Sequence, residues 1–114
     1  MPECLKVYAK DERMERLIGD RKELMKIYGA ARAAKIQRRV KELRSLRNLQ
    51  DAMTNSSFRF HALHNDRHGQ LSVKIDFRHR MVLEITEQKP TEQAGDLSGV
   101  VSVTIKELCV NYHT

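Results

Sequence analysis

Apolar residues in the first half of the chain recur every three or four positions. The first run consists of Met14, Leu17, Ile18, Leu24, Ile27 and Tyr28, and the second of Ala33, Ile36, Val40, Leu43 and Leu46. This spacing places each run on one face of an α-helix. Asp11 is a candidate cap for the first run, and Gly29 interrupts the pattern between the runs. We therefore expect two helices, or one helix broken at Gly29.

Alternation of apolar and polar residues replaces the helical period after Asn55. The alternating segments are 58–62, 70–75 and 80–85, and each predicts a half-buried strand. A hairpin at 65–69 and a tight turn at 77–79 would connect them as three antiparallel strands. The polar stretch at 88–99 predicts a loop.

The last strand, expected at about 100–112, changes the parity of its apolar positions part-way along. Val101, Val103 and Ile105 are odd-numbered, whereas Leu108 and Val110 are even-numbered. A one-residue β-bulge near Lys106 and Glu107 would reset the alternation and turn both sets toward the core.

Together these elements predict an α+β fold formed by a single domain of residues 1–114. Two N-terminal helices pack on one face of a small, mainly antiparallel sheet, and a short strand at 4–8 joins the sheet. The other face of the sheet is expected to be polar and basic. Its expected residues are Arg59, His61, Lys74, Arg80, Asn111 and His113, with Tyr112 at the edge.

Composition narrows the class of protein. The chain has 114 residues and a mass of 13.3 kDa, which favours one domain. Its 21 lysines and arginines against 15 acidic residues give a net charge of +6, which attracts polyanions such as nucleic acid. A hydrophobic content of 40% is too high for a disordered tail. No apolar run reaches the roughly 18 residues of a membrane helix, so no membrane association is expected.

The beginning of the chain and its cysteines indicate a cytoplasmic protein. Glu3 stands where a signal peptide would be basic, and no apolar segment follows. Cys4 and Cys109 lie near opposite ends of the sequence, and in a reducing compartment we expect separate thiols.

Basic side chains cover the outer face of the second helical run. They are Arg32, Lys35, Arg38, Arg39, Lys41, Arg44 and Arg47. Two explanations remain open, because a solvated helix face is usually charged and a basic stripe also suits ribosomal RNA or a protein partner.

The expected polar face gathers imidazoles, guanidinium groups and a phenol. This set suits metal-free RNA cleavage, in which the 2′-OH attacks, one group removes its proton, another protonates the leaving 5′-oxygen, and cations offset the phosphate charge. Histidine serves either proton-transfer role near neutral pH. There is no cluster of Asp and Glu for magnesium, and His61, His64 and His68 lack a fourth zinc ligand. We expect neither a metal nor a cofactor.

The sequence also resembles the HigB-type toxins of the RelE/ParE superfamily, from about Glu15 to the end. The residues that carry the resemblance are Tyr28-Gly29-Ala30, Lys41-Glu42-Leu43-Arg44, the stretch His61-Ala62-Leu63-His64-Asn65-Asp66-Arg67-His68-Gly69-Gln70-Leu71-Ser72-Val73, Arg80 and the closing Tyr112-His113. The middle stretch combined with the terminal Tyr-His is the more specific part.

The resemblance implies a RelE-like fold and a toxin of a type II toxin-antitoxin system. Such a toxin is a cytoplasmic endoribonuclease that enters the ribosomal A site, next to 16S rRNA, and cuts messenger RNA during translation. Its implied partner is a helix-turn-helix antitoxin of the HigA type, and operator DNA would be contacted only through that antitoxin.

The resemblance also implies catalytic residues. His61 matches the histidine at the start of the motif and His113 the C-terminal histidine, and both are candidate acid/base groups. Tyr112 matches a tyrosine that orients the scissile nucleotide, and Arg80 an arginine that stabilises the phosphate.

His64, Arg67, Lys74 and Asn111 are the expected RNA-binding residues. His64 falls where related toxins often carry lysine, so its positive charge depends on pH. Asn111 stands where many relatives have aspartate, which replaces a carboxylate with a neutral amide. That change keeps an alternative open, namely a non-enzymatic binding module of the same fold. Such a module would be a ParE-like gyrase inhibitor or a catalytically weakened regulatory toxin.

Overall fold

The computed structural model describes residues 4–62, 70–91 and 96–111. Its helices are α1 (Glu12–Ile18), α2 (Arg21–Tyr28), α3 (Ala30–Arg44) and α4 (Leu49–Thr54). Its strands are β1 (Lys6–Ala9), β2 (His61–Ala62), β3 (Gln70–Lys74), β4 (His79–Gln88) and β5 (Val100–Asn111). Two short 3₁₀ helices, η1 (Ser56–Phe58) and η3 (Leu97–Gly99), complete the described elements. None of the described helices has the length and apolar character to cross a membrane.

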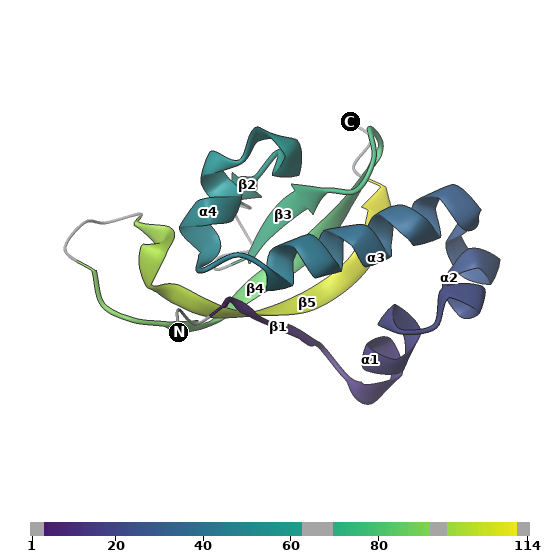
Figure 1. Cartoon of the computed structure of the whole chain (residues 1–114), viewed down its shortest axis with the longest axis horizontal. Helices are drawn as coiled ribbons and strands as arrows, with labels where there is room; N and C mark the ends of the chain where they lie inside the picture. Colours follow the sequence, from purple (N-terminus) through teal and green to yellow (C-terminus); the bar gives the residue numbers. More distant parts are fainter. Residues whose placement is uncertain (1–3, 63–69, 92–95, 112–114) are drawn as a thin grey trace.

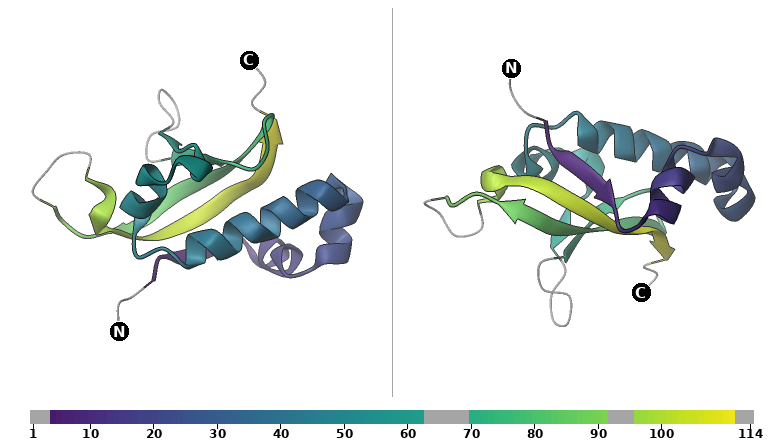
Figure 2. Two further views of the ribbon diagram at one scale, coloured as in Figure 1. Left: turned by 45° about the horizontal axis from the view of Figure 1, so that its top comes forward. Right: turned by 90° about the horizontal axis from the view of Figure 1, so that it is seen from below.

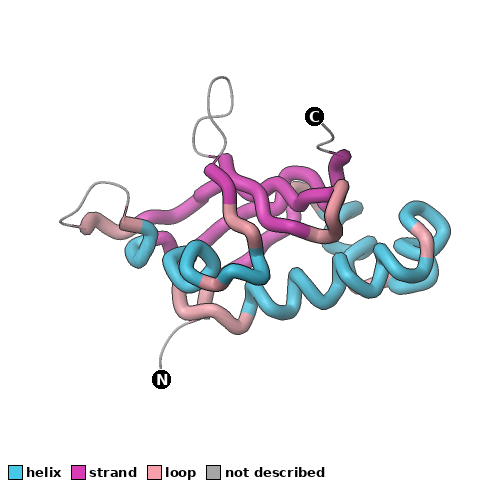
Figure 3. Tube along the Cα trace, turned by 90° about the horizontal axis from the view of Figure 1, so that it is seen from above, coloured by secondary structure: helices cyan, strands magenta, loops and turns pink. Residues whose placement is uncertain are grey.

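The strands form one sheet in the order β1-β5-β4-β3-β2. β1 runs parallel to β5, and the other neighbours are antiparallel. Figures 1 and 3 show α3 and α4 on the same side of this sheet, and Figure 2 shows β1 beside β5. One hydrophobic core cluster combines buried residues of all four helices with those of the sheet. The α+β fold with helices on one face of a mainly antiparallel sheet is thus confirmed.

The number of helices differs from the two that were expected. The first run is divided at Gly19, where Asp20 caps a new helix by accepting a hydrogen bond from the backbone N–H of Glu23 at 3.1 Å. Asp11 does cap α1, accepting from the N–H of Met14 at 2.8 Å. Gly29 separates α2 from α3 with a φ of 88°, a backbone conformation that glycine adopts readily. The break at Gly29 is therefore confirmed, and α4 was not anticipated.

The segment before β2 is not the strand that its alternation predicted. Phe58 ends η1 and is buried, and β2 consists of His61–Ala62 alone. Arg59 between them has φ 46° and ψ 52°, in the left-handed region. Asn55 favours this helical turn because its side chain accepts a hydrogen bond from the N–H of Ser57 at 3.0 Å. Arg59 thus belongs to a turn rather than to the sheet.

The pairing of β4 with β5 shifts at four places, and two of them lie in the second half of β5, where one bulge was expected. Val82 pairs with Glu107 and Leu83 with Ile105, so an extra residue lies near Lys106, where the bulge was expected. A second shift follows, because Arg80 pairs with Val110 and two β5 residues oppose Met81. Those two are Leu108, which is buried, and Cys109, which packs against the core. The expectation that Val110 faces the core was wrong, because the second shift moves Val110 to the side of Arg80.

Arg39 connects α3 to two other elements. Its Nε donates to the backbone carbonyl of Lys74 at 2.8 Å, and its Nη2 donates to the carbonyl of Ser57 at 3.0 Å. The guanidinium carbon lies 4.6 Å from the ring centroid of Phe58, and Nη1 is 3.3 Å from Glu42. Burial is the main cause that lowers the pKa of Arg39, against the opposing effect of Glu42. This one side chain fixes α3 relative to β3 and η1.

Replacing Arg39 by alanine is expected to lower the free energy of unfolding by about 2 kcal/mol, because two carbonyls lose a charged donor. Urea unfolding followed by circular dichroism measures this change. Arg38→Ala is the matched control, since the neighbouring side chain is 81% exposed, against 12% for Arg39. The control should stay within about 0.5 kcal/mol of the unmodified chain. Equal effects of the two substitutions would contradict the structural role of Arg39.

Candidate functional site

The face of the sheet opposite the helices brings three of the expected site residues together. His61 of β2 pairs with Ser72 of β3, and Ser72 pairs with Val82 of β4. Lys74 pairs with Arg80 two residues further along the same two strands. Because paired residues point to the same side of a sheet, His61, Lys74 and Arg80 share this helix-free face. Among them, His61 is exposed.

Arg80 is held in place by its neighbours on this face. Its Nε donates to Oγ of Ser72 at 2.7 Å, and its Nη2 donates to the carbonyl of Ser72 at 3.3 Å. Nη2 also donates to the carbonyl of Arg59 in the turn before β2. The guanidinium group thus positions the start of β2, from which His61 projects. Its cationic charge and the imidazole of His61 lie on either side of Ser72.

The helix-free face is less polar than expected. Ser72 and Ser102 are buried, and so is Val82, although Val82 does not belong to the main core cluster. Ser102 shares a hydrogen bond with Thr86 at 2.9 Å between their hydroxyl oxygens. Buried residues therefore occur on both faces of the sheet.

Asn111 does not lie on this face. It pairs with His79, which precedes Arg80 in β4 and points to the opposite side of the sheet. The expectation that Asn111 shares a face with Arg80 was wrong because the second half of β5 has two register shifts rather than one. Its expected contact with RNA remains a prediction.

Four of the expected site residues lie outside the described residues. These are His64, Arg67, Tyr112 and His113. The His61, His64 and His68 set is likewise only partly described. Within 4–62, 70–91 and 96–111, no group of three His, Cys, Asp or Glu side chains is arranged to hold a metal ion.

The two cysteines are free thiols in the structure. Cys109 packs against the core, and burial raises the pKa of its thiol to about 11. A thiol with such a pKa stays protonated near neutral pH, and the nucleophile in cysteine chemistry is the thiolate. Cys109 is therefore a packing residue in this arrangement.

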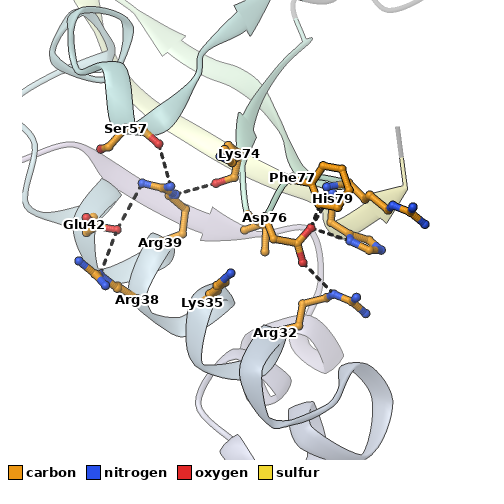
Figure 4. Close-up of a pocket in the computed structure, with 12 residues that line it drawn as sticks. Arg32, Lys35, Arg38, Arg39, Glu42, Ser57, Lys74, Asp76, Phe77 and His79 are labelled. Carbon is orange, nitrogen blue, oxygen red and sulfur yellow. Dashed lines mark hydrogen bonds and ion pairs between the residues drawn. The ribbon is translucent and has the colours of Figure 1, made fainter. Parts of the chain in front are cut away.

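A groove of about 670 Å³ lies on the helix side, between α3 and the turn that connects β3 to β4 (Figure 4). We call it the basic groove. Its lining residues are Arg32, Lys35, Arg38, Arg39, Glu42, Ser57, Lys74, Ile75, Asp76, Phe77, Arg78 and His79. Five of the six cations come from α3 and the turn, whereas Lys74 presents the carbonyl that Arg39 binds. Figure 4 shows Lys35 extending from α3 toward the turn.

Asp76 organises the turn at the edge of the groove. It accepts hydrogen bonds from the backbone N–H groups of Arg78 and His79, both at 3.0 Å, and lies 2.8 Å from Nδ1 of His79. Its other carboxylate oxygen accepts from Nε of Arg32 at 3.2 Å. Burial alone would raise the pKa of Asp76, but the hydrogen bonds from His79, Arg78 and Arg32 hold it well below its usual range. A charged carboxylate thus links the turn to α3.

Two parts of the groove could be predicted from the sequence. The basic face of α3 was visible, and so was the tight turn near residues 77–79, but nothing indicated that they oppose each other. His79, at the end of that turn, is the first residue of β4 and lies 2.8 Å from Asp76 through its Nδ1. The spacing of Asp76 and His79 is the signal that could have linked the two, because an aspartate often caps the N–H groups two and three residues on.

One of three comparisons with known proteins found a similar chain. No family model matches the sequence, and no curated protein matches it. Among solved structures, a YoeB/ParE toxin from Agrobacterium tumefaciens is similar, with a TM-score of 0.53 and 13% identity. The alignment covers 96% of this chain and 100% of that one. The two chains share a fold. Since the match extends over both chains, the shared fold includes the sheet and the helices that cover it.

The lowered pKa of Asp76 makes a prediction about acid stability. A carboxylate whose pKa is depressed on folding stabilises the fold above its unfolded pKa of about 3.9 and loses this contribution as the pH falls below that value. Asp76→Asn should therefore lower the urea midpoint at pH 7, and the difference from the unmodified chain should shrink by pH 3. Glu23→Gln, in an exposed pair with Lys26, is the control and should change little at either pH. A gap that stays constant with pH would contradict the role of Asp76.

Proposed function

We propose that the chain is the toxin of a type II toxin-antitoxin system and acts as a ribosome-dependent endoribonuclease on messenger RNA. The observation that carries this proposal is the juxtaposition of His61 and Arg80 around Ser72 on the helix-free face. It occurs in a fold shared with a YoeB/ParE toxin. The resemblance of the sequence to HigB-type toxins agrees with both.

The proposed chemistry needs no metal. Histidine is a common general acid and base, and His61 is exposed, so RNA can reach it. Arg80 supplies a positive charge for the phosphate. The 2′-OH of the RNA attacks the adjacent phosphorus, the bond to the 5′-oxygen breaks, and one acid/base group removes a proton while another supplies one. His113 is the proposed partner of His61 in these transfers, and Tyr112 orients the nucleotide.

The proposed setting is the cytoplasmic ribosome. The messenger RNA would be cut in the A site beside 16S rRNA, with His64, Arg67, Lys74 and Asn111 contributing RNA contacts. A helix-turn-helix antitoxin of the HigA type would hold the toxin inactive and carry it to operator DNA. The net charge of +6 favours association with ribosomal RNA and makes it sensitive to salt.

One observation favours the alternative of a non-enzymatic module. Asn111 supplies no carboxylate and pairs with His79 rather than with Arg80, so it offers no negative charge beside a histidine on the helix-free face. A ParE-like gyrase inhibitor or a weakened regulatory toxin would need no such group. This alternative predicts inhibition of gyrase supercoiling, or antitoxin binding alone, without RNA cleavage.

Primer extension on a defined message in a reconstituted translation reaction tests the proposal. The unmodified chain should produce cuts only when ribosomes are present. His61→Ala and His113→Ala should each reduce the cutting rate by about 100-fold or more, the usual contribution of a general acid or base. Lys22→Ala is the control, because Lys22 is exposed on α2, away from the helix-free face.

Circular dichroism should show all variants folded, since His61 is exposed and its removal leaves the core intact. Unchanged cutting by both histidine variants would contradict an acid/base mechanism that uses His61 and His113. No cutting by the folded, unmodified chain would refute the nuclease, and a supercoiling assay with gyrase would then test the alternative.

A further inference from the structure

The basic groove has the chemistry of a nucleic-acid site, and it lies on the opposite side of the sheet from His61 and Arg80. We propose that it binds an unpaired RNA strand, with phosphates along α3 and one base stacked on Phe77. The groove volume of about 670 Å³ lies in the range of about 300 to 1,000 Å³ that is typical of ligand sites.

The charges of the groove are unbalanced. Its two acidic side chains are both engaged, Asp76 by Arg32 and His79 and Glu42 by Arg39. Lys35 and Arg78 form no ion pair with any described residue. Arg38, which is 81% exposed, reaches Glu42 only at 4.0 Å. Lys35 and Arg38 on α3 and Arg78 in the turn are therefore available to bind successive negative charges.

Phe77 distinguishes a nucleic acid from other polyanions. It stands at the end of the groove in the turn and is 84% exposed, the most exposed large hydrophobic residue in the described part of the chain. The guanidinium carbon of Arg78 lies 5.2 Å from its ring centroid. An exposed aromatic ring beside a cation is a stacking platform for an unpaired base. An acidic peptide would use the cations but would have no need of the ring.

The groove is preorganised. The four hydrogen bonds to Asp76 fix the turn and join it to α3, and Arg39 fixes α3 against β3. The backbone segments that carry Phe77 and the cations are therefore fixed before binding, which reduces the conformational entropy lost when RNA binds.

The groove also adjoins the candidate active site. His79 lines the groove and the next residue, Arg80, lies on the helix-free face, so the two surfaces meet at the turn between β3 and β4. A strand held along α3 would pass this turn and reach the face that carries His61. The link between holding and cutting rests on the proposed function, whereas RNA binding in the groove does not.

Fluorescence anisotropy with a labelled 12-nucleotide 2′-O-methyl oligouridine tests the inference, because this probe lacks the 2′-OH needed for cutting. Lys35→Gln is compared with Lys41→Gln, which removes the same charge from an exposed position on the same helix outside the groove. Lys35→Gln should weaken binding several-fold and lower the slope of log affinity against log salt by about 0.7, the value for one phosphate contact on a single strand. Lys41→Gln should leave the slope unchanged.

Two substitutions of Phe77 test the stacked base. Phe77→Leu keeps an apolar side chain but loses the flat ring, and should weaken binding by about fivefold or more. Phe77→Trp keeps the ring and should bind like the unmodified chain. Equal behaviour of Lys35→Gln and Lys41→Gln, or no effect of Phe77→Leu, would overturn the inference. Displacement of the probe by polyglutamate at lower concentration than by unlabelled oligouridine would overturn it in favour of an acidic protein partner.

His61→Ala separates this inference from the proposed function. It should bind the probe like the unmodified chain while failing to cut messages on ribosomes. Cutting without groove-dependent binding would refute the groove alone. Groove-dependent binding by an unmodified chain that never cuts would refute the nuclease alone.

Discussion

The guanidinium group of Arg39 connects α3 directly to β3 and to η1. Apolar contacts bring helix and sheet together but fix their relative position only loosely, since the hydrophobic effect has no direction. Arg39 orients α3, because its planar guanidinium group donates to the carbonyls of Lys74 and Ser57 at the same time. The same group lies over the ring of Phe58. The groove beside it and the entry to β2 both follow from this geometry.

One hairpin supports both surfaces of functional interest. β3 and β4 carry Ser72 and Arg80 on the helix-free face, and the turn between them carries Asp76 and Phe77 at the basic groove. Arg80 is bonded to Ser72 on one side, and Asp76 is bonded to Arg32 on the other. Both anchors involve a charged group, so each surface is held by hydrogen bonds stronger than those between neutral groups.

The sequence was most informative where a single period extends over several residues. The α3 stripe of Ala33, Ile36, Val40 and Leu43 is buried as its spacing requires, and the alternation in β3 and β4 assigned Lys74 and Arg80 to one face. The parity change in β5 correctly indicated a bulge near Lys106. These predictions succeed because periodicity reports directly which side of an element is buried.

Short and irregular segments were harder to predict. The six residues of α4 are too few to show a helical period, although Asn48 carries a cap signal and bonds to the N–H of Gln50. Around Arg59 the apolar residues alternate by chance, and the turn geometry follows from Asn55 instead. At the end of β5, either Cys109 or Val110 fits the core, and only the register with Met81 decides between them. The groove was missed because it joins segments distant in sequence, which one sequence alone does not pair.

The parallel pairing of β1 with β5 has a consequence for how the protein reaches its folded state. β1 is the first strand and β5 the last of the described chain, so this edge of the sheet depends on contacts between distant parts of the sequence. Contacts of that kind are slow to form, whereas the α2 and α3 hairpin is local. During synthesis the helices can form first, while β1 has no neighbour until β5 has left the ribosome. This edge of the sheet therefore forms only once β5 is available to pair with β1.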